Sequence, residues 1–236
     1  MPSVALAPEE ARRALYIDFE GRKDRPPILL GCTRRSRVQR DSSVWQAITD
    51  PRFESLALAD GLEALTLADA VARILVRAEA KNRLIVAWSQ HELYVVGEHA
   101  PEHLDRFAAR YVNARTFAVR WRNKCRGGAK PASNTLADYL ALSGYRVPEG
   151  AGPGRAGETI GILQRAFDLG RMPSDLTDNQ LRRWRDLREH NRHDCTGMRS
   201  VCTIAADAIA KADRRDDPRP PRLDTRRVVR SRVQVA

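Results

Sequence analysis

Cysteine is scarce in this 236-residue sequence, and its spacing is irregular. The four cysteines form no CxxC motif and no regular pattern; they are Cys32, Cys125, Cys195 and Cys202. This arrangement argues against a zinc site and against a disulfide framework. The last two lie in an apolar helical pattern, so we expect them to be core thiols. Cysteine usage of this kind predicts a cytoplasmic protein.

Long apolar runs are missing as well. No stretch approaches the ~20 residues that a membrane-spanning helix needs, and the N-terminus lacks a charged region followed by an apolar core. We therefore expect neither a membrane segment nor a targeting segment. Internal repeats are also absent, and the length suits one sizeable domain or two small ones.

Acidic residues are in the minority. The sequence has 41 Lys and Arg against 30 Asp and Glu, a formal net charge of +11, and its pI is near 10.1. This balance favours polyanionic partners, with nucleic acid first and an acidic membrane surface second. A solvated basic surface, or a coding bias that replaces Lys by Arg, is the alternative explanation. We predict nucleic acid as the partner.

The first half of the chain reads as strands with helices between them. Strands are expected at 14–20, 28–33, 42–50 and 83–88, and helices at 67–80 and from about 91 to 110. The first three strands resemble an antiparallel meander. The fourth is a short, continuous apolar run, which is typical of a buried strand.

The second half is mostly helical. The expected segments are a basic linker at 116–134, a helix at 135–144, a loop at 145–157, and helices at 158–170 and 176–212. Asn134 or Thr135 caps the first of these helices, and Gly144 ends it. The last segment is either one long helix or two abutting ones. We predict an α/β domain over 1–212, a mixed sheet flanked by helices, and a disordered basic tail at 213–236 that can dock a partner.

Two carboxylates stand two positions apart in the apolar stretch LYIDFE, at Asp18 and Glu20. Successive side chains of a strand point to opposite faces, so these two point the same way. Paired negative charges repel each other, and burying them is costly unless something positive lies between them. Although exposed DxE sequences are common, this pair is a candidate metal site because its strand is apolar.

The expected C-terminal helix carries another acid on its apolar face. At 100° per residue, that face comprises Leu187, Met198, Val201 and Ala205. Asp194 falls in the middle of this stripe, and His190 lies on its edge one turn earlier. The opposite face carries Arg185, Arg192 and Arg199. A buried carboxylate needs a cation or strong hydrogen-bond donors, so Asp194 is a candidate metal ligand; pairing with a nearby Arg is the alternative.

A further acid follows the buried strand at 83–88. Glu92 stands at the start of the next helix, and ligands gather at strand ends in open α/β sheets. The alternative is an ordinary first-turn residue that the helix dipole favours. His91 can equally be a solvent-exposed neighbour, and Glu98 is a less well-placed rival for the same role.

These segments together supply four acids, Asp18, Glu20, Glu92 and Asp194. Mg²⁺ and Mn²⁺ are hard ions that take oxygen ligands. Two such ions about 4 Å apart can activate a water and stabilise the leaving oxygen in phosphoryl transfer. The sequence therefore holds the ligands that a two-metal site requires.

The order of DFE, AWSQHE and HNRHD resembles the DEDD exonuclease group of the ribonuclease-H-like superfamily, in particular the exonuclease-like domains associated with RecB-type nucleases. The segment TLADYLALSGYRVP is similar to one in those domains, and the likeness covers roughly residues 14–205. It implies a ribonuclease-H-like fold and a 3′–5′ exonuclease of DNA or RNA that uses two Mg²⁺ or Mn²⁺ ions. It also implies that Asp18, Glu20, Glu92 and Asp194 bind metal, and that His190 orients or deprotonates the attacking water.

Two other functions fit the same sequence. One is a non-catalytic nucleic-acid-binding or adaptor module on the same fold with a degenerate site, which predicts salt-sensitive binding without cleavage. The other is a transposon- or defence-linked partner protein whose basic tail docks another macromolecule. Metal-dependent cleavage separates the nuclease from both.

Overall fold

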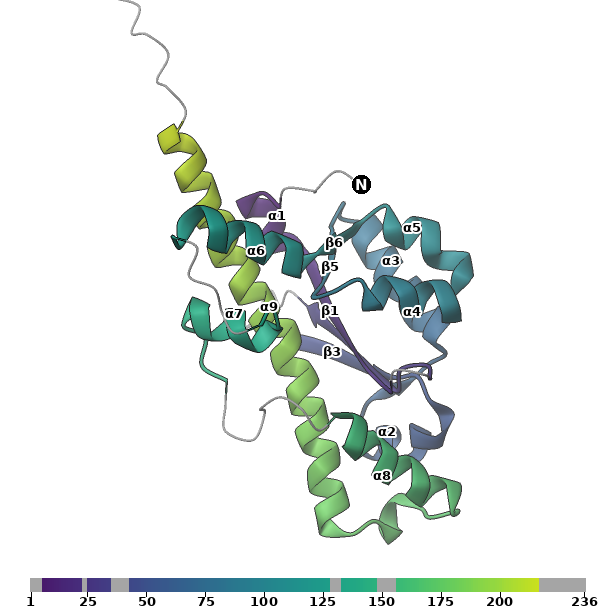
Figure 1. Cartoon of the computed structure of the whole chain (residues 1–236). Coiled ribbons are helices and arrows are strands. Elements are labelled where there is room, and N and C mark those ends of the chain that lie inside the picture. The colour runs from purple at the N-terminus through teal and green to yellow at the C-terminus, as the bar shows by residue number, and fades with distance from the viewer. Residues whose placement is uncertain (1–5, 23–24, 35–42, 128–132, 148–155, 217–236) are drawn as a thin grey trace, which may run out of the picture.

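The computed structural model describes residues 6–22, 25–34, 43–127, 133–147 and 156–216 (Figure 1). Its strands are β1 (Leu15–Glu20), β2 (Leu29–Arg34), β3 (Ser43–Ile48), β4 (Glu63–Ala64), β5 (Ile85–Ala87) and β6 (Tyr111–Asn113). Its helices are α1 (Pro8–Arg13), α2 (Glu54–Ala59), α3 (Leu67–Glu79), α4 (His91–His99), α5 (Leu104–Ala108), α6 (Ala114–Cys125), α7 (Leu136–Ser143), α8 (Ala156–Asp168) and α9 (Asp178–Asp216). Three short 3₁₀ helices are η1 (Pro51–Phe53), η2 (Pro101–His103) and η3 (Pro173–Asp175).

The described strands form one mixed sheet in the order β4-β3-β2-β1-β5-β6. β1, β2 and β3 pair antiparallel, so the predicted meander is confirmed. β5 lies parallel to β1, and β6 lies parallel to β5. The α/β class and the mixed sheet are therefore confirmed, and the carboxyl ends of β1 and β5 lie at the same edge of the sheet.

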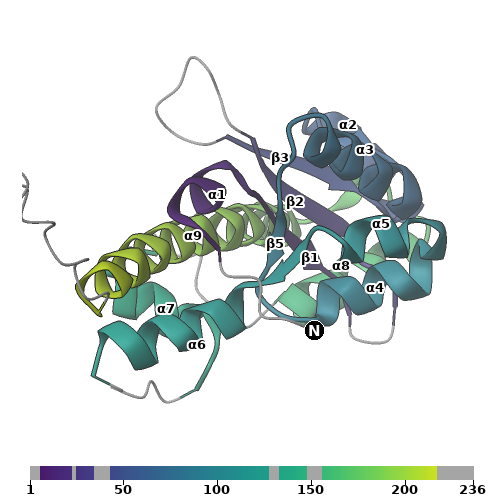
Figure 2. The same cartoon turned by 90° about the horizontal axis from the view of Figure 1, so that it is seen from above.

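Helices cover both faces of the sheet, with α3, α4 and α5 on one side and α1, α6, α7 and α9 on the other (Figure 2). The alternation along β1 follows from this arrangement. Leu15, Ile17 and Phe19 pack in the core beneath α3, whereas Tyr16 packs in the core beneath α9. The predicted split of the β1 side chains between the two faces is confirmed, and it places Asp18 and Glu20 on the α9 side.

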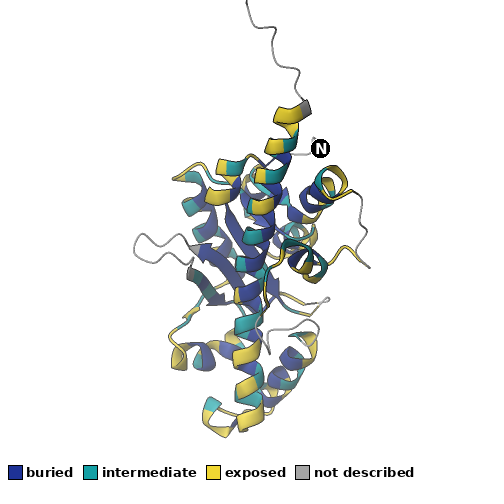
Figure 3. Cartoon of the chain, turned by 90° about the vertical axis from the view of Figure 1, so that its left-hand side faces the viewer, coloured by how far each residue is buried: buried dark blue, intermediate teal, exposed yellow. Residues whose placement is uncertain are grey.

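The segment at 176–212 is a single helix, α9, which crosses the sheet and contacts β1, β2 and β3. Its predicted apolar stripe is buried; the stripe is Leu187, Met198, Val201 and Ala205. Both ends of the helix are exposed where they project beyond the sheet (Figure 3). The helix continues to Asp216, so the expected start of the tail at 213 is wrong; Lys124 of α6 pairs with Asp213 there. The remainder of that tail, 217–236, lies outside the described residues.

The expected linker at 116–134 is wrong over its first part, because Ala114–Cys125 is helix α6. The Asn113 side chain caps this helix by accepting a hydrogen bond from the Thr116 amide. Phe117 and Trp121 are buried one turn apart. Basic residues stand between these apolar positions in the sequence, and the apolar side chains anchor the helix against α9. The middle of the expected linker, 128–132, lies outside the described residues.

The expected single helix from about 91 to 110 is interrupted. Pro101 lacks an amide hydrogen and restricts the residue before it, and Ala100 accordingly leaves helical geometry, with φ −150° and ψ 52°. The chain continues as η2 and α5 and then forms β6, which the sequence reading did not predict. This break brings Tyr111 beside β5, where it lines one flank of the site described below.

The helices around 140 and 160 begin and end close to the predicted positions. Thr135 caps α7 in a capping box, and Gly144 ends it in the left-handed region with φ 76°. α8 starts two residues earlier than expected, and Gly170 with φ 75° follows its end. Of the expected loop at 145–157, residues 148–155 lie outside the described residues.

All four cysteines are free, and the two expected core thiols, Cys195 and Cys202, are buried. Among the described residues, no helix combines the length and the apolar character that crossing a bilayer demands.

Candidate metal centre

Two segments of the sheet edge carry acids. Glu20 is the last residue of β1, and Asp18 precedes it on the same face. Glu92 lies in the first turn of α4, shortly after β5 ends at Ala87. Because β1 and β5 are parallel neighbours, these acids gather at one edge of the sheet, where α/β proteins bind their ligands.

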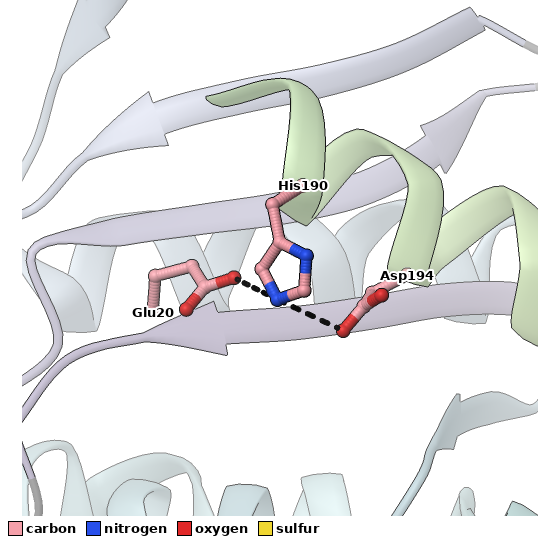
Figure 4. Close-up of side chains that lie close together, drawn as sticks. All are labelled: Glu20, His190 and Asp194. Atoms are coloured by element: carbon pink, nitrogen blue, oxygen red, sulfur yellow. Dashed lines mark ion pairs between the residues drawn. The ribbon is translucent and has the colours of Figure 1, made fainter. Parts of the chain in front are cut away.

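Helix α9 adds His190 and Asp194 to the acids of β1 (Figure 4). The His190 Nε2 atom lies 3.8 Å from Glu20 Oε1 and 3.6 Å from Asp194 Oδ2. One ligand atom from each of the three residues lies within 4.8 Å of the others. The side chains of His190 and Asp194 remain 20% and 25% exposed, so a solvated ion can reach the group.

Asp18 is half-buried next to this group. The Asn191 side-chain amide donates hydrogen bonds to Asp18 Oδ2, at 2.9 Å, and to the Asp18 carbonyl oxygen, at 3.1 Å. Burial raises the pKa of Asp18, while the hydrogen bond from Asn191 and the proximity of His190 lower it in part. The carboxyl groups of Asp18 and Glu20 also interact with each other, which lowers the pKa of Asp18 and raises that of Glu20.

Burial and mutual repulsion govern the electrostatics of the acids. The pKa of Glu20 is raised well above its ordinary value by burial and by the charges of Asp18 and Asp194. Burial and the Asp18 charge also raise the pKa of Asp194 to about 7 and that of Glu92 to about 8. The charge of Asp18 disfavours ionisation of Glu20, Glu92 and Asp194, as expected of carboxylates that share a site.

In the part of the chain that the structure describes, no Arg or Lys forms an ion pair with these acids. Asp194 pairs with His190, and among the described residues no Arg forms the alternative ion pair with it. Glu20 likewise pairs with His190, and Asp18 bonds to Asn191. Among the described residues, no ion pair joins Asp18, Glu20, Glu92 or Asp194 to an Arg or Lys.

Glu92 is a first-turn residue of α4, as its alternative explanation requires, but it is also buried. Ser89 Oγ donates to Glu92 Oε2 at 3.4 Å, and the Tyr111 hydroxyl bonds to the Ser89 carbonyl oxygen. Although its pKa responds to Asp18, Glu92 is not part of the group that meets within 4.8 Å. It therefore flanks the cluster at the β5 side.

His91 and Glu98, which stand near Glu92 on α4, are both exposed, whereas Glu92 is buried. His91 is exposed, and its charge lowers the pKa of Asp18. Glu98 is exposed and interacts with the Tyr94 hydroxyl. Of the two glutamates on α4, only Glu92 is buried toward the acids.

Asn191 and Gln46 contact the site and were not among the sequence candidates. Asn191 is fully buried and lies three residues before Asp194, which places both on the same side of α9. A polar residue at a core-facing helical position was the signal that could have identified Asn191. Gln46 on β3 gave no such signal, because it reaches the site only through Asn191.

The chain matches no protein-family model, no curated protein and no solved structure. Its function therefore has to be argued from the geometry of this site.

The donor set fits a hard divalent ion. Carboxylate oxygens are the preferred ligands of Mg²⁺ and Mn²⁺, and an imidazole nitrogen is compatible with a transition metal such as Mn²⁺. Burial first and then the charge of Asp18 raise the pKa values of Asp194 and Glu92, so ionising all of these acids in the folded chain is unfavourable. A bound cation would relieve that repulsion, because it attracts every carboxylate that it contacts.

Proposed function

We propose that this protein is a metal-dependent nuclease that hydrolyses phosphodiester bonds of nucleic acid, in the manner of a 3′–5′ exonuclease. One observation carries the proposal. Acids from β1, α4 and α9, which are far apart in the sequence, converge at one sheet edge, and among the described residues no Arg or Lys forms an ion pair with them. A core with a purely structural role does not require such a cluster, because burying carboxylates costs more free energy than burying apolar residues.

Asp18, Glu20, Glu92 and Asp194 would hold Mg²⁺ or Mn²⁺, with two ions as the resemblance implies. Such ions polarise a phosphate and make a water nucleophilic near neutral pH. His190 Nε2 faces the acids at 3.6–3.8 Å, where it can accept a proton from a water or join the carboxylates as a ligand. Asn191 orients Asp18 through its amide.

The fold is consistent with the ribonuclease-H-like architecture that the motif order implies, since the described sheet is mixed and flanked by helices on both faces. Net charge supports a polyanionic substrate. Arg115 and Arg120 of α6 and Arg126 directly after it are exposed and contribute to this charge. A phosphate backbone would be attracted to these side chains in a salt-dependent way.

End-labelled single- and double-stranded DNA and RNA, incubated with the protein in EDTA, Mg²⁺ or Mn²⁺, test the proposal. We expect stepwise shortening from the 3′ end in the presence of metal and none in EDTA. Salt-sensitive binding without cleavage in either metal would instead support the non-catalytic nucleic-acid-binding module.

The C-terminal segment 217–236 gives a separate prediction about binding. It carries six arginines and two acids, so its removal should weaken affinity for nucleic acid and flatten the salt dependence. The melting temperature should change little, because the described core ends with α9. Fluorescence anisotropy across a salt series measures both quantities. A full-length control with these arginines replaced by glutamine should match the truncation; unchanged affinity and slope in both proteins would show that the segment does not contact phosphate.

A further inference from the structure

The α9 side of the sheet has a glycine between two polar residues. Asp18 of β1 pairs with Gly31 of β2, and Gly31 pairs with Gln46 of β3. The three residues therefore form one row across the sheet. Because Gly31 has no side chain, α9 can approach the row closely and place Asn191 over it.

Asn191 connects the two ends of this row. Its Nδ2 donates to the Asp18 carboxylate at 2.9 Å, and its Oδ1 accepts a hydrogen bond from Gln46 Nε2, also at 2.9 Å. Gln46 Nε2 in turn donates to the Arg188 carbonyl oxygen at 2.8 Å. Asn191 is 0% exposed, so water cannot replace either partner.

The direction of these bonds is determined by Gln46. Since the Gln46 amide is a donor to both Arg188 and Asn191, Asn191 must turn its oxygen toward β3 and its N–H groups toward Asp18. The opposite orientation would place Asn191 Oδ1 against the Asp18 carboxylate, and two acceptors would face each other. Gln46 is thus the residue that makes Asn191 a donor to the site.

Gly31 is required for this arrangement. A methyl group at position 31 would overlap the Asn191 amide oxygen and would approach Cys195 Sγ to 2.9 Å. Asn191 has nowhere to move because it is buried and bonded on both sides. The glycine, the glutamine and the asparagine therefore act as one unit, although they come from three different elements.

We propose that Asn191 is a positioning residue that fixes the Asp18 carboxylate for cation binding, and that Gln46 supports it by setting the orientation of its amide. The inference rests on the proposed function, because it assigns these residues to the metal site of that function. Asn191 donates its hydrogen bond to Asp18 Oδ2, so the second oxygen of the carboxylate is left to bind a cation. Hydrogen bonds of this kind to metal ligands typically change metal affinity or activity by about 10- to 100-fold.

Titration of the purified full-length protein with Mn²⁺ alone tests the proposal, with free Mn²⁺ measured by electron paramagnetic resonance. We expect the affinity of Asn191→Ala to be about 10- to 100-fold lower than that of the parent. Gln46→Met removes the orienting donor without adding charge, so it should also weaken binding. The double variant should bind no more weakly than Asn191→Ala, because Gln46 acts only through Asn191.

A buried control separates positioning from stability. Val201→Ala creates a cavity on the same helix, in the core beneath α9 and away from the acids. It should lower the melting temperature and leave Mn²⁺ affinity within twofold of the parent. Gln46→Met keeps the test available if Asn191→Ala does not fold.

Three outcomes would overturn the inference. Unchanged Mn²⁺ affinity in folded Asn191→Ala, or in Gln46→Met if only that variant folds, would make these residues structural and leave the proposed function intact. Fully additive losses in the double variant would show that Gln46 does not act through Asn191. A parent that binds no Mn²⁺ would overturn the proposed function and this inference together.

Discussion

Replacing Asp18 by asparagine should reduce Mg²⁺- or Mn²⁺-dependent cleavage by about 10³-fold or more, equivalent to about 4 kcal/mol of activation free energy. Asp18 influences every other acid of the cluster, because its charge raises the pKa of Glu20, Glu92 and Asp194. Asparagine preserves the shape and can still accept the hydrogen bond from Asn191, so the fold should survive. Initial rates on a labelled oligonucleotide, with circular dichroism to verify folding, measure the effect.

Two further variants strengthen this comparison. Asp194→Asn should also abolish cleavage, since its carboxylate faces His190 and Glu20 across the candidate centre. Glu98→Gln removes an exposed acid from the same region of the surface and should retain full activity. Full activity in Asp18→Asn or in Asp194→Asn would exclude the proposed site.

The parts of the site that the sequence predicts are those governed by simple periodicity. A strand alternates its faces at every residue, so Asp18 and Glu20 had to lie together once LYIDFE was recognised as a strand. A helix turns by 100° per residue, so Asp194 had to share a face with buried Met198 and Val201. Neither inference required knowledge of the tertiary structure.

The parts that the sequence does not predict depend on contacts between distant segments. Gln46 lies in β3 and reaches the site only because Gly31 lets Asn191 of α9 lie over the sheet at that point. No local pattern links those three positions. Pro101 and the strand after it are a similar case, since the pairing of β6 with β5 needs a partner that the local sequence does not reveal.

His190 shows where a motif and its geometry diverge. The resemblance makes it a residue that acts on water, whereas the structure places its Nε2 between two carboxylates. A position between like charges is also where a cation is most stable. The Mn²⁺ titration of a His190→Gln variant, beside its cleavage rate, distinguishes a ligand from a base, because loss of a ligand weakens metal binding, whereas loss of a base lowers the cleavage rate and leaves binding unchanged.

The repulsion among the acids should make the metal-free protein sensitive to pH. Unfolded Asp and Glu have pKa values of about 3.9 and 4.3, whereas the folded values are about 7 for Asp194 and about 8 for Glu92. Between these pKa values, Asp194 and Glu92 are protonated in the folded protein and ionised in the unfolded chain. Stability from these groups is complete below about pH 4 and is lost as the pH rises to about 8.

Thermal melts in EDTA should therefore show a lower melting temperature at pH 8.5 than at pH 5.5 for the parent. The melting temperature of Asp18→Asn should fall less over the same pH range, because this variant lacks the charge that raises the pKa of its neighbours. At pH 8.5 the variant should be at least as stable as the parent. Saturation with Mn²⁺ at 100 times its Kd adds about 2.7 kcal/mol to the folded parent, or about 5–10 °C. The variant should gain much less.

The sign of the asparagine effect decides between a metal site and a structural ion pair. If Asp18 were held by a buried Arg, asparagine would leave that charge unpaired and would cost about 3 kcal/mol or more. Instead, the partners of Asp18 are an amide and other acids, so removing its charge relieves repulsion. A strongly destabilised Asp18→Asn together with a parent that is indifferent to Mn²⁺ would end the metal-site hypothesis. A variant that is stable in EDTA and unresponsive to metal, beside a parent that Mn²⁺ stabilises, would support a cation held between the acids of β1 and α9.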